Sequence, residues 1–247
     1  MSALILALAA GAVIGLALGA LGGGGSVLAV PALIYLLGFT PVAATTASLV
    51  IVTVTSATAL IAHARDGNVR WRTGLMFAAA GIVPAMLGGL LAGRLPGPVL
   101  TMAFAAVAGV AAVRMLRPRR ARPVTTVRPG KAAAAGAGLG AVTGVLGVGG
   151  GFLAVPALVS VLGLRMKAAV GTSLLVITVN SLAALAMRAG TADGLDWGLI
   201  APFAAAAVLG AWDGKRLAAK VSGGMLQRIF AMVLLLVASL MLADAVL

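Results

Sequence analysis

The sequence predicts an all-α polytopic membrane protein made of two inverted five-helix repeats. Three observations support this fold class: long apolar runs, a duplicated glycine-rich motif, and basic residues confined to the loops between the runs. Of 247 residues, 62% are hydrophobic and 9% are charged, and the mean hydropathy is +1.17. A soluble domain carries about 25% charged residues. This composition therefore excludes an ordinary soluble domain.

Ten apolar segments follow one another along the chain, and most approach the ~20 residues that a helix needs to cross the hydrocarbon core. The second segment of each half has only about 12 residues, roughly 17 Å of helix. The expected segments are Ala3–Leu21, Ser26–Leu37, Pro41–Ala62, Thr73–Gly93, Gly97–Val113, Ala132–Leu146, Phe152–Leu162, Ala168–Met187, Gly198–Ala211 and Gly224–Leu247.

The distribution of basic residues decides between two topologies. If the two short segments do not cross, each half has four spans and both halves face the same way. If they do cross, the halves are inverted, and fifteen of the 18 Lys and Arg residues fall on one side, with only Arg94 and Arg188 on the other. The remaining one, Arg228, lies inside the last segment near its cytoplasmic end. Because cytoplasmic loops carry an excess of Lys and Arg, the second topology is favoured. It places both termini outside the prokaryotic cytoplasmic membrane and the linker inside.

An internal repeat appears when the chain is shifted by 125 residues. Gly22–Gly38 then aligns with Gly147–Gly163, with eleven of 17 positions identical. We divide the chain into repeat 1 (residues 1–113), a basic cytoplasmic linker (114–131) and repeat 2 (132–247). Inverted repeats with short, Gly- or Pro-interrupted segments at matching positions are typical of secondary transporters.

Each glycine run precedes an undersized helix, and such a run is tolerated at membrane depth only where it lines protein or a water-filled cavity. The first backbone amides of each short helix lack an intrahelical acceptor and carry the positive end of the helix dipole. We expect the two N-termini to face a shared central cavity and bind an anion there. The alternative is that the glycines only allow close helix packing. The candidate residues are Gly24, Gly25, Ser26, Gly149, Gly150 and Gly151, with helix breaks at Pro31 and Pro156.

Hydroxyl side chains open the third and eighth segments and are candidates to complete the anion site. They are Thr46 and Ser48 in the first half and Thr172 and Ser173 in the second. The alternative is that each hydroxyl bonds a carbonyl one turn earlier in its own helix.

At these residues the sequence resembles the TauE/SafE sulfite exporter family, also called the 4-toluene sulfonate uptake permease family. The resemblance rests on the glycine runs that lead into LAVPAL at Leu28–Leu33 and Leu153–Leu158, and on Thr46-Ala47-Ser48 and Gly171-Thr172-Ser173. It covers nearly the whole chain. It implies membrane transport of sulfite or of organosulfonates such as sulfoacetate, most simply export.

Other function classes find little support. With no Cys, one His and no Glu, the chain offers neither a metal or cofactor site nor the groups of an intramembrane enzyme. The basic residues lie in loops, which argues against nucleic-acid binding.

Two alternatives stay open: a drug/metabolite-type carrier of another small anion, and a passive anion channel. For the expected transporter, H⁺ and Na⁺ are the candidate coupling ions. His63 is expected to be a solvated residue at a helix end, and Asp213 to pair locally with Lys215 and Arg216.

Overall fold

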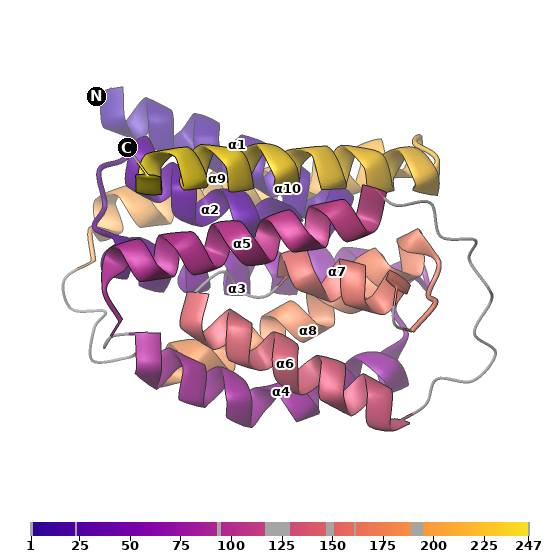
Figure 1. Ribbon diagram of the computed structural model, residues 1–247. Coiled ribbons are helices and arrows are strands. Elements are labelled where there is room, and N and C mark those ends of the chain that lie inside the picture. The colour runs from indigo at the N-terminus through magenta and orange to yellow at the C-terminus, as the bar shows by residue number, and fades with distance from the viewer. Residues whose placement is uncertain are drawn as a thin grey trace.

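The protein is an all-helical bundle in the computed structural model, which describes residues 2–22, 24–92, 95–116, 129–146, 151–160, 162–188 and 195–246. Within these residues the chain forms ten helices and no strand. Figure 1 shows them running along a common direction, with both chain termini at the same end of the bundle. The helices are α1 (Ser2–Leu21), α2 (Gly24–Tyr35), α3 (Pro41–Arg65), α4 (Trp71–Ala92), α5 (Gly97–Leu116), α6 (Pro129–Leu146), α7 (Gly151–Ser160), α8 (Met166–Ala186), α9 (Trp197–Ala219) and α10 (Gly223–Val246).

The all-α membrane fold predicted from the sequence is confirmed. Six of the described helices are long and apolar enough to cross a membrane: α1, α3, α4, α5, α8 and α9. The second and seventh helices are short, as predicted, with 12 residues in α2 and 10 in α7. The local sequence explains where α3 begins, because Thr40 accepts a hydrogen bond from the amide of Ala43 and Pro41 occupies the first turn.

The centre of the bundle is the pair α3 and α8, which are the most buried of the six long helices. Their middles meet where the hydroxyls of Ser56 and Thr178 lie 2.9 Å apart. Arg188, just after α8 ends, donates to Thr45 in the first turns of α3. The two helices therefore run antiparallel. They also carry most of the buried polar side chains among the described residues.

Two tight helix pairs flank this centre, α1 with α9 and α4 with α6. Glycines make the close approach possible: a Cβ atom at Gly15 of α1 would collide with the backbone of Ala207 in α9, and one at Gly140 of α6 with that of Gly81 in α4. Helix α3 packs against α9 and α8 against α4, while α5 and α10 form a further pair. Exchanging each first-half helix for its second-half counterpart reproduces these contacts.

The short helices return the chain from one end of the bundle to the other. The last turn of α1 reaches the C-terminal end of α3, where Gly19 contacts His63. The last turn of α6 reaches the C-terminal end of α8, where Gly144 contacts Arg188. Because α3 begins at the end opposite to His63, the chain from α2 to the start of α3 must cover the length of the bundle, and the chain from α7 to the start of α8 does the same.

Basic residues gather at one end, which we call the basic end. Lys215 pairs with Asp66 there, and Gln227 at the start of α10 donates to the Met115 carbonyl at the end of α5. The described Lys and Arg residues at this end are Arg65, Arg70, Arg72, Arg114, Lys131, Arg165, Lys167, Lys215, Arg216, Lys220 and Arg228. We call the other end the Arg188 end, since Arg188 is the basic residue that the described part of the chain places there.

Candidate functional site

The first glycine break lies against the start of α8. Gly22 has a left-handed backbone, with φ +68°, a conformation that favours glycine. A Cβ atom there would sit 2.7 Å from Ser173 Oγ and 3.1 Å from the Val170 Cα atom. The glycine break of the first half therefore lies against a serine of the second half. Helix α2 begins two residues after Gly22, at Gly24.

Four further predicted residues lie close to Gly22 or Ser173 in the sequence: Gly24, Gly25, Ser26 and Thr172. Ser173 and Ser26 are fully buried, and the Ser173 hydroxyl donates to the Val170 carbonyl at 2.7 Å. Thr172 is also fully buried, and its hydroxyl oxygen accepts a hydrogen bond from the Arg70 amide at 3.0 Å. Thr172 thus keeps its own O–H proton for another acceptor. Gly24 and Gly25 form the first turn of α2.

The remaining predicted hydroxyls lie nearer the other end of α3. Thr46 donates to the Val42 carbonyl at 3.2 Å, and Ser48 donates to the Thr45 carbonyl at 3.1 Å. The antiparallel register of α3 and α8 places Ser48 about 20 Å along the helix axis from Ser173. The described candidates thus fall into two groups, one toward each end of the bundle. The expectation of one shared cavity stays a prediction.

The second glycine break is described only at its margin. Gly151 is the first residue of α7, whereas Gly149 and Gly150 lie outside the described residues. Pro31 lies within α2 and Pro156 within α7, so each short helix contains the proline that the repeat predicts.

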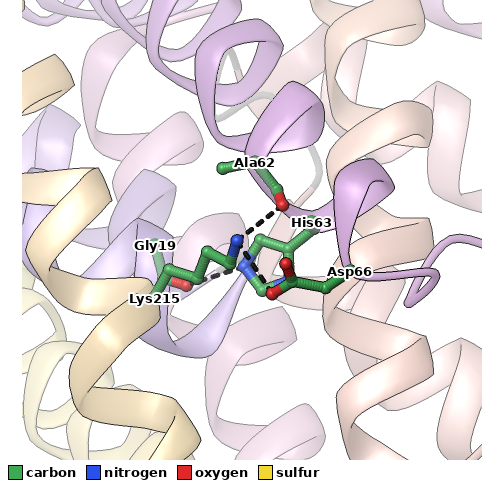
Figure 2. A network of polar contacts seen from close by, with 5 residues as sticks. All are labelled: Gly19, Ala62, His63, Asp66 and Lys215. Carbon is green, nitrogen blue, oxygen red and sulfur yellow. Dashed lines mark hydrogen bonds and ion pairs between the residues drawn. The ribbon is translucent and has the colours of Figure 1, made fainter.

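His63 is not the solvated residue that the sequence suggested. It is 5% exposed, and its Nε2 atom lies 3.1 Å from the carbonyl oxygen of Gly19, on the last turn of α1. Beside it, Lys215 from α9 donates to the Ala62 carbonyl and pairs with Asp66 at 2.8 Å. Figure 2 shows these five residues converging from α1, the end of α3 and α9. The expected pairing of Asp213 is confirmed for Arg216, at 3.3 Å. It is wrong for Lys215, which pairs with Asp66 instead.

Arg188 also differs from its expected place in an outer loop. It is 6% exposed, and its guanidinium donates to the Thr45 hydroxyl at 2.8 Å and to the Gly144 carbonyl at 2.9 Å. Burial lowers the pKa of Arg188 to about 10, which still leaves it protonated at neutral pH. A fixed positive charge thus lies inside the protein, between the start of α3 and the end of α6.

The 125-residue repeat relates these two sites and was the signal that could have found them. His63 and Arg188 occupy matching positions, and so do their carbonyl partners Gly19 and Gly144. Sequence reasoning treated His63 as a solvated residue at a helix end and Arg188 as a charge in an outer loop, because it compared the two equivalent loops only for their charge. Among the described residues, no group of three His, Cys, Asp or Glu side chains could hold a metal ion.

Comparison with known proteins identifies the family. The family described as "Sulfite exporter TauE/SafE" matches residues 7–241. The chain is 35% identical over 244 residues to a "Probable membrane transporter protein" of Xylella fastidiosa (strain 9a5c), covering 95% of this chain and 93% of the relative. A protein of the same name from Haemophilus influenzae is 28% identical over 179 residues, covering 69% of this chain and 67% of the relative. The chain is a multi-pass integral membrane protein that belongs to the TauE/SafE sulfite exporter family of membrane transporters.

Proposed function

We propose that this protein is a secondary transporter that moves sulfite or small organosulfonate anions across the cytoplasmic membrane, in the direction of export. Membership of the family supports transport, and the family description supports sulfite. The names of the relatives say only that they are membrane transporters.

The observation that carries the proposal is the contact between the Gly22 break and Ser173. Immediately after this break, the first turn of α2 has amide donors without intrahelical acceptors and the positive end of the helix dipole. From the facing half, Thr172 adds a hydroxyl whose proton is not used in its bond with the Arg70 amide. The Ser173 hydroxyl donates to the Val170 carbonyl and can donate to an anion only by leaving that carbonyl. Sulfite and sulfonate oxygens only accept hydrogen bonds, so a cluster of N–H and O–H donors suits them.

Two such half-sites, one toward each end of the bundle, fit alternating access. The residues of the first are Gly24, Gly25, Ser26, Thr172 and Ser173; those of the second are Gly149, Gly150, Gly151, Thr46 and Ser48. If the halves are inverted copies, as the matched helix contacts support, each half-site faces a different side of the membrane. Rocking of one helix group against the other would expose them in turn.

The test is anion flux through purified protein in liposomes. We expect saturable sulfite uptake that sulfoacetate competes away and that an uncharged analogue leaves unchanged. Unsaturated, high conductance would instead mark a passive channel. Saturable flux of other small anions without competition by sulfite or sulfonates would favour a drug/metabolite-type carrier.

A pair of glycine variants tests the site itself. Gly25→Leu puts a bulky side chain in the first turn of α2, and we expect it to reduce flux by about a hundredfold, since small displacements of binding groups are costly. Gly224→Leu is the matched control, because a side chain at Gly224 has nothing within 4 Å. Wild-type flux from a folded Gly25→Leu protein would remove the break from the site.

A further inference from the structure

His63 is a buried titratable group that the anion site does not use. We propose that His63 binds one proton and releases it in each transport cycle, so that the movement of the anion is coupled to the movement of H⁺. This inference rests on the proposed function, because it assigns the coupling ion of the same transport cycle.

The hydrogen bond to Gly19 fixes which nitrogen of His63 carries the proton in the neutral ring. A backbone carbonyl can only accept, so Nε2 must be the N–H donor in this 3.1 Å contact. The Nδ1 atom then holds a lone pair. Nδ1 is buried, and no residue in the described part of the chain forms a hydrogen bond to it. One position is therefore open for one proton.

Two charged groups face this imidazole, and they act in opposite directions. Asp66 lies just after α3 and Lys215 lies on α9, both beside the ring (Figure 2). A carboxylate favours a protonated imidazole, whereas burial and a neighbouring ammonium oppose it. The facing group from α1 is the uncharged Gly19 carbonyl. Lys215 and Asp66 are held together at 2.8 Å, so their charges largely cancel at His63 while the pair is closed. Opening the pair leaves the Asp66 carboxylate free to stabilise the imidazolium.

A proton on His63 and an anion at the first break assist each other. Gly19 lies three residues before Gly22, so the imidazole is attached to the last turn of α1 before the break. Positive charge here raises the affinity of the break for an anion, and the bound anion must raise the affinity for the proton by the same factor. The proton and the anion then cross together, in the direction that their combined gradients set.

The second half supplies the natural contrast. Arg188 occupies the matching position and bonds the matching carbonyl, but its guanidinium stays protonated at neutral pH. An imidazole is the side chain whose ordinary pKa, about 6.5, permits loading and unloading of a proton near neutrality. Of the two equivalent positions, the one at the basic end can therefore exchange a proton and the other cannot.

The experiment measures two quantities in proteoliposomes: counterflow of labelled sulfoacetate without a pH gradient, and the change in lumenal pH during sulfoacetate influx. Sulfoacetate is the probe because neither acid group titrates between about pH 6 and pH 8, unlike sulfite. We expect wild-type influx to acidify the lumen. Counterflow without acidification in the wild type would overturn the inference and leave the proposed function standing, whereas absence of counterflow would remove the proposed function.

Two variants keep a hydrogen-bond donor for the Gly19 carbonyl and remove the group that titrates near neutral pH. His63→Gln retains an N–H donor for Gly19, and His63→Arg copies the residue of the other half. We expect both to keep counterflow at saturating sulfoacetate, with a weaker apparent affinity in His63→Gln because this variant lacks the positive charge. Both should lose about tenfold or more of the acidification per sulfoacetate. Acidification at the wild-type ratio in either variant would overturn the inference.

A third variant decides the matter if both of these proteins lose counterflow. Asp66→Asn removes the carboxylate that favours the imidazolium, so we expect half-maximal flux to move to lower pH. Lys215 loses its partner in the same variant and adds to that shift. An unchanged pH profile would count against His63.

Discussion

Gly22 and Gly38 have nearly the same left-handed backbone, with φ +68° and +70°, in very different surroundings. Gly22 lies against Ser173 and Val170, whereas a side chain at Gly38 has nothing within 4 Å. Any residue other than glycine costs about 1–2 kcal/mol in this conformation. The pair therefore separates the cost of backbone strain from the cost of filling the break.

We expect Gly22→Ala to reduce anion flux about tenfold beyond the effect of Gly38→Ala. The added Cβ atom must push Ser173 and Val170 away by several tenths of an ångström, and ~1.4 kcal/mol suffices for a tenfold change. Initial rates in liposomes, divided by the amount of folded protein, measure the difference. Equal rates in the two variants would show that Gly22→Ala acts only through backbone strain and not by filling the break.

Residue-level expectations from the sequence succeeded where they depended on the repeat and failed where they depended on the loops. The repeat predicted the prolines inside both short helices. His63 and Arg188 were missed because a charge next to a predicted span is usually solvated. Instead, His63, in the last turn of α3, contacts α1, and Arg188, in the turn after α8, contacts α6. No local sequence pattern predicts these contacts, because each joins residues 44 positions apart in the chain.

At the level of whole helices, glycine stripes determine which helices pair. Gly11, Gly15 and Gly19 form one stripe on α1, facing the α9 backbone. The matching stripe on α6 is Gly136, Gly140 and Gly144, facing α4. Small residues at a spacing of four let membrane helices approach closely and gain van der Waals contact. The packing alternative considered for the breaks therefore holds for these glycines, which the sequence analysis did not single out.

Two glycines of α6 provide a direct test of this packing. Gly140→Leu would collide with the backbone of Gly81, whereas a side chain at Gly138, on the exposed side of the same helix, meets nothing within 4 Å. We expect Gly140→Leu to destabilise the protein by about 3 kcal/mol, the upper part of the usual range for overpacking. Thermal unfolding in detergent measures the difference, with Gly138→Leu as the control. Equal melting temperatures would contradict the assigned α4–α6 contact.

For the whole molecule, we expect the basic end to face the cytoplasm, because basic residues are retained on that side. The chain contains no cysteine, so single cysteines report their own accessibility. Leu36→Cys, between α2 and α3 at the Arg188 end, should react with an impermeant maleimide in intact cells. Ser222→Cys, between α9 and α10 at the basic end, should react only after permeabilisation. The reverse pattern would invert the orientation.

The order and approximate limits of the ten helices could be predicted because a bilayer selects long apolar runs. The pairing of α1 with α9 and of α4 with α6 could not. In a soluble helix, a polar face identifies the side that points to solvent. These helices are apolar on all sides, so hydropathy does not distinguish a face toward lipid from a face toward another helix. Only the stereochemistry of glycine against a facing backbone carries that information.

The pairing of α1 with α9 also sets the order in which the molecule can be completed during synthesis. When the ribosome has released the first half, α1 already lies in the membrane, but its partner has not been made. The glycine stripe of α1 must face lipid or other early helices until α9 is inserted. Helix α1 therefore waits for its final neighbour while the intervening helices are made, and the early intermediates depend on the membrane, or on an assembly factor, to keep that surface from wrong partners.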